Sequence, residues 1–585
     1  MNTRSCYYFL ISCLFLLGVF HSGCKGKKSL DRALVVRHMA DPDMLNPLNS
    51  KSANANEING LIFASINSME MKCEYDLVPF LTKQLGIVSE ITEGDFKGGM
   101  KIEYEIREEA KWDNGDPVTA NDYVFTLKAI LNPQTNCLHL KSMFDWVGDV
   151  VIDPSNPRKY TVYSRKKYFK IEEFAGYVII PEYNYDPKKL MRKFSLRELY
   201  DPEKREALKL DADINAFATE FNSEKFQRDP KFITGLGPYK LESWTTGQEI
   251  VLTRKENWWG DQFRDERHFW AYPKKIKFKI INDQNTALTT LKDDGLDIFY
   301  GMPAKEFMDL DQNREFKNKF RTDKKDILAY TFLYFNLRNK KFQDFNVRKA
   351  IAHAINRKKI NDAINNGENI LTESFIHPSQ KTYDKTLKPY EFDLKLANQL
   401  LDQAGWIDTD GDGIRDKEID GQRIPLTVNF KYNAGNEQRK NTALIIQEDF
   451  VKIGISMQIE AKEWSVFIQE LGKHQFEMTY AGFAVPPRIG DPRQTWHTEN
   501  AVPGGDNNSG WGGPESDKLI EDIGKELDPD LRRQMYMSLQ KMIHEDLPVV
   551  FLFAPKNRLA LSRRYDVEFN LVSPGFLLNE FKLAQ

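Results

Sequence analysis

The chain has 585 residues, of which 41% are hydrophobic and 29% are charged, and its net charge is −3. A chain of this length is too long for one compact core and predicts roughly three or four domains. Acidic and basic residues are mixed throughout, which argues against nucleic acid or an acidic membrane surface as a partner. Aromatic residues make up 12% of the chain, which suits either a large core or an apolar ligand cleft.

The N-terminal segment has the pattern of an export signal. A positively charged start is followed by an apolar stretch at residues 7–20, which is too short to span a membrane comfortably. Two small residues then precede Cys24, an order that resembles the cleavage site of bacterial lipoproteins, although His21 departs from the usual aliphatic residue. We expect a signal peptide at 1–23, lipidation of Cys24 and a tether at 24–32. An ordinary secretory signal and an uncleaved anchor are the alternatives.

Two cysteines, Cys73 and Cys137, remain in the mature chain besides the expected lipid-bearing Cys24. In an oxidising compartment such an even pair can form a disulfide. Two separate buried thiols are the alternative, and the sequence does not decide between them. No segment after Cys24 approaches the roughly 20 apolar residues that a spanning helix needs. The lipid anchor is therefore the one membrane contact that we expect.

A strand, a turn and a capped helix are predicted in succession before residue 130. Alternating apolar residues indicate a strand at 102–106. The D-N-G-D-P run at 113–117 is typical of a tight turn, because its Asn-Gly pair tolerates positive φ and its proline stops the strand. Thr119 then occupies a helix N-cap position, and Asp122 three residues later can complete a capping box.

Glycine motifs and one helical pattern mark the rest of the chain. The G-L-G-P-Y run at 235–239 allows a backbone bend that β-carbons would block, and N-W-W-G follows at 257–260. The G-L-D-I run at 295–298 leads into a further strand. Apolar residues at Val347 and Ile351 have helical spacing, so this segment is predicted to face a core.

These motifs together resemble the signature of the family 5 extracellular solute-binding proteins, the dipeptide- and oligopeptide-type receptors of ABC importers. The resemblance is carried by W-D-N-G-D-P-V-T-A-N-D at 112–122 and by the glycine motifs, and it runs from about residue 33 to 560. It implies an α/β, two-lobed periplasmic-binding-protein fold (type II, cluster C) with an extra subdomain in the first lobe. The expected units are lobe I at 33–75 and 231–328, the extra subdomain at 76–230, lobe II at 329–547, and a return to lobe I at 548–585.

The resemblance also implies where a solute binds. Pro486 stands where the peptide receptors have the aspartate that holds the ligand's α-ammonium. Asp491 can substitute for it, and if it does not, the ligand lacks a free amine. Packing at the lobe edge is the alternative role for the aromatic residues of the loop that follows, Trp496 and Trp511. The predicted ligand-binding residues are Met39, Asp41, Trp464, Gly482, Phe483, Ala484, Asp491, Trp496 and Asn508.

An acidic loop is the candidate metal site. Asp408, Asp410, Asp412 and Asp416 have the spacing by which a loop surrounds Ca²⁺ with oxygen ligands, but Ile419 occupies the position of the usual bidentate acid. A metal-free surface turn is the alternative. In either case the loop is expected to be structural, and no cofactor is required.

The sequence contains no G-x-S-x-G, H-E-x-x-H or Walker motif, so we expect a binding protein and not an enzyme. The predicted protein is a lipid-anchored monomer on the periplasmic face of the bacterial envelope. It binds short peptides by hinge closure and delivers them to an ABC permease and ATPase complex. The alternatives are the same fold binding oligosaccharide or another non-amine solute, a signalling receptor, and a surface hydrolase.

Overall fold

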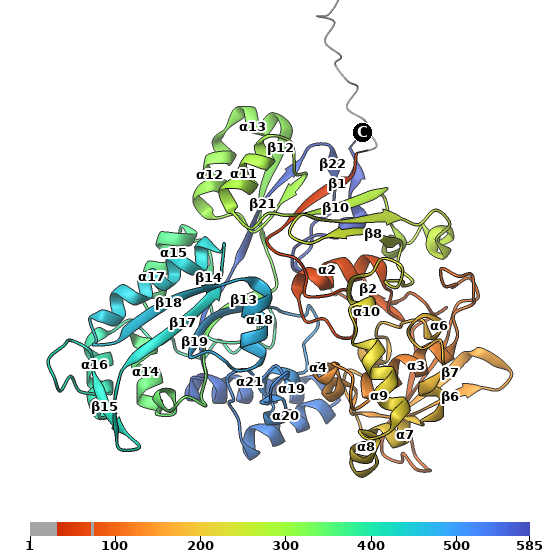
Figure 1. Ribbon diagram of the computed structural model, residues 1–585, viewed down its shortest axis with the longest axis horizontal. Helices are drawn as coiled ribbons and strands as arrows, with labels where there is room; N and C mark the ends of the chain where they lie inside the picture. Colours follow the sequence, from red (N-terminus) through yellow and green to blue (C-terminus); the bar gives the residue numbers. More distant parts are fainter. Residues whose placement is uncertain (1–31, 72–74, 585) are drawn as a thin grey trace, which may run out of the picture.

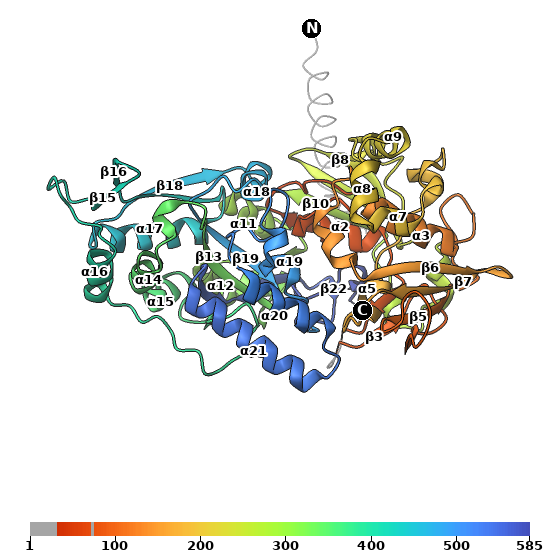
Figure 2. The same ribbon diagram turned by 90° about the horizontal axis from the view of Figure 1, so that it is seen from below.

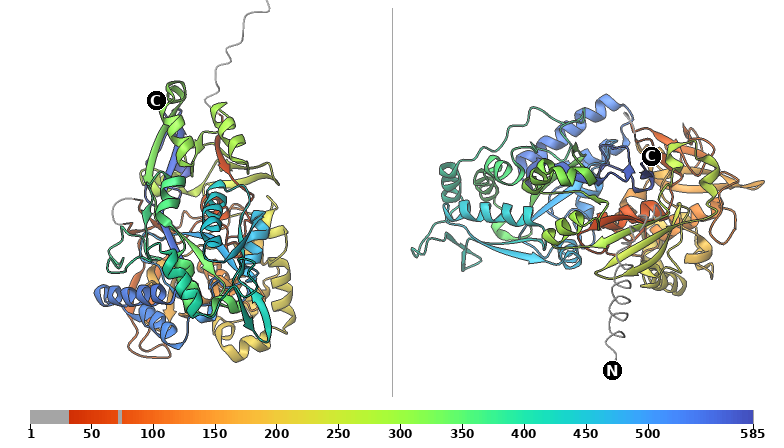
Figure 3. Two further views of the ribbon diagram at one scale, coloured as in Figure 1. Left: turned by 90° about the vertical axis from the view of Figure 1, so that its left-hand side faces the viewer. Right: turned by 90° about the horizontal axis from the view of Figure 1, so that it is seen from above.

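The computed structural model describes residues 32–71 and 75–584, which form two lobes with a third unit attached to the first (Figure 1). Lobe II lies on the left of Figure 1, the extra subdomain on the right, and the sheet of lobe I above them. The same separation is seen from below (Figure 2) and from above (Figure 3). The signal peptide, Cys24 and Cys73 lie outside the described residues. In the described part, no helix is long and apolar enough to cross a membrane.

Lobe I is built on a seven-stranded sheet in the order β12-β21-β11-β1-β10-β9-β8. β1 is parallel to β10 and β11, and the other neighbours are antiparallel. All five residues of β1 are buried, as expected for a central strand covered on both faces. The strands are β1 (Leu34–His38), β8 (Tyr239–Thr245), β9 (Glu249–Arg254), β10 (Lys275–Ile280), β11 (Ile298–Phe299), β12 (Phe320–Asp326) and β21 (Lys556–Ser562); the helices are α2 (Ala53–Ile62), α11 (Gln284–Lys292), α12 (Ala304–Gln312) and α13 (Arg314–Lys319).

The extra subdomain is a four-stranded antiparallel sheet in the order β4-β5-β7-β6, with short helices around it. The predicted capping box is confirmed at the start of α3, where the N–H of Thr119 donates to Oδ2 of Asp122 (3.0 Å). Segments 185–230 form short peripheral helices. The elements are β4 (Ile87–Glu90), β5 (Met100–Glu105), β6 (Val147–Asp153), β7 (Asn156–Ser164), α3 (Ala120–Leu131), α4 (Leu138–Lys141), α5 (Ile171–Ala175), α6 (Glu182–Tyr185), α7 (Leu196–Tyr200), α8 (Pro202–Leu208), α9 (Ala212–Phe221) and α10 (Lys225–Arg228), with the hairpin β2 (Asn67–Met69) and β3 (Leu77–Pro79) beside it.

The glycines of the 235–239 motif are required by a close approach to α2. The N–H of Gly237 donates to the carbonyl of Ile62 (2.8 Å), and a β-carbon on Gly237 would overlap the backbone of Leu61 and Ile62. The turn can therefore pack against the end of α2 only with glycine here.

We expect Gly237→Ala to lower the free energy of unfolding by at least about 1 kcal/mol, because the clash is with backbone that cannot rotate away. Gly60→Ala is the matched control in α2, since no atom lies within 4 Å of its added methyl group. That change should stabilise the helix by about 0.5–1 kcal/mol. Thermal and denaturant unfolding of the two variants measure the difference, and equal stability of both would contradict the packing argument.

Lobe II has a six-stranded sheet in the order β14-β20-β13-β19-β17-β18. The predicted core helix is confirmed, since Val347 and Ile351 are fully buried. The strands are β13 (Ala329–Phe335), β14 (Ile370–Leu371), β17 (Thr427–Asn433), β18 (Ser456–Lys462), β19 (Met478–Ala484) and β20 (Val549–Ala554); the helices are α14 (Phe345–His353), α15 (Arg357–Asn365), α16 (Leu394–Gln403), α17 (Glu437–Val451), α18 (Trp464–Gly472), α19 (Arg493–Trp496), α20 (Pro514–Lys525) and α21 (Pro529–Asp546); the hairpins are β15 (Asp416–Ile419) with β16 (Gln422–Pro425), and β22 (Tyr565–Asp566) with β23 (Lys582–Leu583) on the lobe I side.

The chain passes between the two large sheets twice, and one expected boundary is wrong. The first passage lies between β12 and β13, at the predicted place. Residues 548–585 were expected to return to lobe I together, but β20 pairs with β13 in the lobe II sheet. All six residues of β20 are buried, and such an apolar strand could occupy the centre of the sheet in either lobe. The return to lobe I begins at β21, after Pro555.

Candidate functional site

A cavity of about 530 Å³ lies between the lobes, within the size range of small-ligand sites. Lobe I and the extra subdomain supply one side of it, from the segment before α2 and from the region around α4. Lobe II supplies the other, from β13, α18, the end of β19 and the loops that follow. The residues named below from its lining are Lys51, His139, Met143, Tyr177, Tyr330, Phe375, Gln380, Phe483, Ala484, Pro486, Asp491, Gln494, Trp496, Asp506 and Asn508.

One edge of β19 is open where the strand enters this cavity. β13 pairs with β19 along its whole length, whereas β17 pairs with it only at Met478 and Thr479. Among the described strands none pairs with the second edge from Tyr480 onward. Gly482 and Ala484 are exposed there and carry small side chains. Backbone N–H and C=O groups of such an edge can bind an extended chain by adding a strand.

Aromatic side chains form the lobe II wall of the cavity. Trp496 is 3% exposed; its ring packs edge-on against Trp511 (5.8 Å between centroids) and at a tilt against Phe375 (5.7 Å). Phe483 contacts the ring of Tyr330 in the same edge-on manner (6.0 Å). These side chains hold one another in place, so the wall is formed without a ligand.

Three pairs of polar side chains, among other polar contacts, join the lobes around the cavity. Lys51 Nζ lies 2.9 Å from Asp506 Oδ1, and the hydroxyl of Tyr168 donates to Asp491 Oδ2 (2.8 Å). Arg493 of lobe II lies 3.5 Å from a carboxylate oxygen of Asp145 in the extra subdomain. Because each contact has one partner in each lobe, all three exist only when the lobes are together.

His139 lines the subdomain side of the cavity and is buried. Its Nδ1 has no hydrogen-bond partner among the described residues. Burial is the main cause that lowers the pKa of His139 to about 4; the nearby charge of Lys51 contributes in the same direction, and Asp506 acts in the opposite direction. The imidazole is therefore neutral at pH 7.

This depressed pKa predicts a pH dependence. The pKa of His139 is 6.5 in the unfolded chain and about 4 in the folded chain. As the pH falls from 6.5 toward 4, the unfolded chain therefore takes up a proton that the folded chain does not, and the free energy of unfolding decreases. Between pH 7 and 5 the loss should be about 2 kcal/mol from this group. Denaturant unfolding at pH 7 and at pH 5 measures this loss. Between the two pH values, the free energy of unfolding of the His139→Gln variant should fall by about 2 kcal/mol less than that of the parent. An identical pH response of the two proteins would refute the assignment to His139.

Five of the nine predicted ligand residues line the cavity: Phe483, Ala484, Asp491, Trp496 and Asn508. Gly482 lies beside them in β19. The structure places the other three elsewhere. Asp41 accepts hydrogen bonds from Trp244 Nε1 (2.6 Å) and the N–H of Gly247 (2.7 Å) within lobe I, and Met39 is close to it at the end of β1. Trp464 begins α18 and stacks on Phe467 (6.0 Å).

Several cavity residues were not predicted from the sequence, and most belong to lobe I or to loops. Lys51, His139, Met143 and Tyr177 come from the lobe I side, and Asp506 from a lobe II loop. The run D-P-D-M-L-N-P at 41–47, which precedes Lys51, is the sequence signal for this side of the cavity. Phe144 and Trp146, close in sequence to Met143, are buried in the core of the subdomain.

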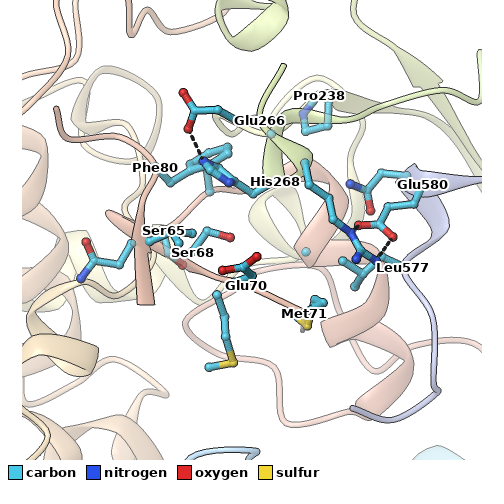
Figure 4. Close-up of a pocket in the computed structure, with 18 of the residues that line it drawn as sticks. Ser65, Ser68, Glu70, Met71, Phe80, Pro238, Glu266, His268, Leu577 and Glu580 are labelled. Carbon is cyan, nitrogen blue, oxygen red and sulfur yellow. Dashed lines mark hydrogen bonds and ion pairs between the residues drawn. The ribbon is translucent and has the colours of Figure 1, made fainter. Parts of the chain in front are cut away.

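A second cavity of about 440 Å³ lies within lobe I and the C-terminal segment (Figure 4). Its charged groups largely pair with each other: both guanidinium nitrogens Nε and Nη2 of Arg267 donate to Glu580, and His268 lies 3.1 Å from Glu266. It receives no residue from lobe II. Closure of the two lobes on a ligand requires residues from both, so the interlobe cavity is the candidate site and this second cavity is not.

The acidic loop brings three carboxylates close together. Single carboxylate oxygens of Asp408, Asp410 and Asp416 lie within 4.8 Å of one another. Both oxygens of Asp408 already accept loop N–H groups, from Gly411 (2.7 Å) and Gly413 (3.0 Å). Asp412 bonds the N–H of Ile414, and Asp416 is held by Thr409 and Arg423. The loop is thus shaped by its own hydrogen bonds.

Two lobes joined by two crossings, with a walled cavity between them, define a solute-binding protein that closes on its ligand. A family model described as "Bacterial extracellular solute-binding proteins, family 5 Middle" matches residues 88–499, and the chain belongs to this family. The two-lobed fold expected from the sequence is confirmed.

Known relatives cover nearly the whole chain. The oligopeptide-binding protein AppA of Bacillus subtilis is 25% identical over 96% of this chain and 95% of its own. Its solved structure, in complex with a nonapeptide, has a TM-score of 0.77 at 22% identity and covers 95% of this chain and 99% of that one. NikZ from Campylobacter jejuni, solved in complex with Ni(L-His), has a TM-score of 0.73 at 19% identity and covers 94% and 99%. The same fold therefore serves different solutes.

Proposed function

We propose that this protein captures short peptides in the interlobe cavity and delivers them to an ABC permease and its ATPase. The open edge of β19 carries the proposal, because it offers a bound peptide a row of backbone hydrogen-bonding groups beside an aromatic wall. Relatives named as oligopeptide- and dipeptide-binding proteins support the peptide class. Closure follows from ligand contacts made to both lobes at once. The binding step needs no chemical conversion of the solute.

The proposal includes the cellular setting. The protein acts as a monomer, anchored by lipid on Cys24 at the periplasmic face of the bacterial envelope. The family name, which describes extracellular proteins, supports export. Mass spectrometry of the protein from its membrane fraction tests the anchor, since cleavage before Cys24 and acylation give a defined mass. A protein released without lipid would overturn this part alone.

Native mass spectrometry tests the peptide class. The mature chain with Cys24 replaced is incubated with a pool of tri- to pentapeptides and with matched peptides whose backbone nitrogens are methylated. We expect adducts of the parent peptides and at least tenfold fewer of the methylated ones, because methylation removes the N–H groups that pair with β19. Saccharide adducts, or equal binding of both sets, would overturn peptide recognition by the strand edge.

A further inference from the structure

The carboxylate of Asp491 lines the cavity but is already engaged by the protein. Its Oδ2 accepts from the Tyr168 hydroxyl (2.8 Å), and its Oδ1 accepts from the N–H of Arg493 (2.9 Å). The positive charges of Arg493 and Lys170 also act on it. Asp491 thus holds the two lobes together, and its charge is compensated before any solute arrives.

Asp506, the other acidic residue on the cavity wall among the described residues, is engaged in the same way. Its Oδ1 accepts from Lys51 Nζ (2.9 Å), and its Oδ2 accepts from Nε2 of Gln494. The Lys51 ammonium also donates to the carbonyl of Gly504. This ion pair is internally neutral, so it offers neither an uncompensated anion nor an uncompensated cation to a ligand.

The rest of the lining has no charge to offer an amine. Trp496, Phe483 and Tyr330 supply aromatic faces, and the uncharged hydrogen-bonding groups include the strand edge and the side chains of Gln380 and Asn508. Moving an ammonium group out of water costs several kcal/mol unless a well-placed anion compensates it. Amide groups and apolar side chains fit such a lining at much lower cost.

We infer that the solute bound here presents no free ammonium group, and the structure assigns a short peptide whose amino terminus is acylated or cyclised. This assignment rests on the proposed function, since it concerns the class of peptide that the same cavity selects. The observation behind it is that every carboxylate of the described lining already has partners on both oxygens.

A competition experiment tests the assignment. The mature protein is incubated at pH 7 with an equimolar pool of apolar tri- to pentapeptides, each present in its free-amine and its N-acetyl form, and adducts are counted by native mass spectrometry. Calorimetric titration with the best pair then gives both affinities. We expect the acetylated member to bind at least about tenfold more tightly, a difference that corresponds to about 1.4 kcal/mol.

A gain-of-function variant provides an independent readout. Pro486 lines the cavity, is exposed, and lies two residues after the end of β19. Pro486→Asp places an unpartnered carboxylate on the wall, so it should shift the preference toward free-amine peptides by tenfold or more. Pro487→Asp is the matched control, because Pro487 does not line the cavity. It should leave the ratio of the two affinities unchanged.

The outcomes separate the two proposals. Tighter binding of free-amine peptides by the parent protein would overturn the blocked-terminus assignment and leave peptide binding intact. No adduct from either form would overturn the peptide function, and the assignment with it. An equal shift from the Pro486 and Pro487 variants would show that the ratio reports overall charge and not the cavity wall, which also contradicts the assignment.

Discussion

Replacing Trp496 with alanine should weaken peptide binding about 30-fold or more. The indole is 3% exposed, lines the cavity, and contacts both Trp511 and Phe375, so truncation removes part of the wall and loosens what remains. Buried tryptophans at binding sites typically contribute 2 kcal/mol or more on truncation. The same change should lower the free energy of unfolding by about 3–5 kcal/mol. Calorimetric titration below the melting temperature, with a peptide found by native mass spectrometry, measures the affinity.

Trp464→Ala is the matched control for this prediction. Trp464 lies in the same lobe and was predicted from the sequence as a pocket residue, but it stacks on Phe467 and does not line the cavity. Its truncation should change the affinity less than about threefold, because affinity follows contact with the ligand. If the Trp464 variant lost binding and the Trp496 variant kept it, the cavity described here would not be the peptide site.

Tyr168→Phe should open the lobes without changing either lobe internally. The hydroxyl donates across the interface to Asp491, so the variant leaves Oδ2 of a half-buried carboxylate without its donor. Hydrogen bonds to charged groups contribute about 1.5–3 kcal/mol. The closed state should lose that amount, and the apparent affinity should fall about 10- to 100-fold because fewer molecules are competent to bind. Titration calorimetry and small-angle scattering without ligand measure the two effects.

Tyr390→Phe is the control for loss of one buried hydroxyl. The Tyr390 hydroxyl donates to the carbonyl of His544 (3.1 Å), and both residues belong to lobe II. This variant should lower the melting temperature slightly and leave the affinity and the scattering radius unchanged. A Tyr168 variant with parental affinity and radius would show that the contact to Asp491 contributes nothing to closure.

Local features of the fold could be predicted from the sequence because their causes are local. The Thr119 capping box, the Gly115 turn with its positive φ of 89°, and the apolar face of α14 depend on residues a few positions apart. The boundary at 548 could not be placed, since a uniformly apolar strand does not reveal which sheet it joins. The partners of Arg348 could not be predicted either, since its guanidinium donates to backbone carbonyls, including those of Phe342 and Asp546.

The residues of the site also fall into those that could be predicted from the sequence and those that could not. Phe483, Ala484 and Trp496 were found because they follow one strand and its loop. Lys51 and Asp506 are 455 positions apart in sequence, so their pairing depends on how the lobes meet. The partner of Asp491 is similarly distant, and without it Asp491 was interpreted as a free amine-binding acid. Sequence patterns report the chemistry of one element, whereas compensation of a charge depends on every element packed around it.

The position of β21 has a consequence for biosynthesis. This strand, residues Lys556–Ser562, lies between β12 and β11 and bonds to both, so lobe I has a gap in its sheet until almost the entire chain has left the ribosome and the export machinery. Lobe II, from β13 to β20, is by contrast one continuous segment. Its sheet can close first, and the emerging protein carries a finished lobe II beside an unfinished lobe I. Interrupted synthesis therefore yields molecules that have half of the receptor and cannot hold a solute.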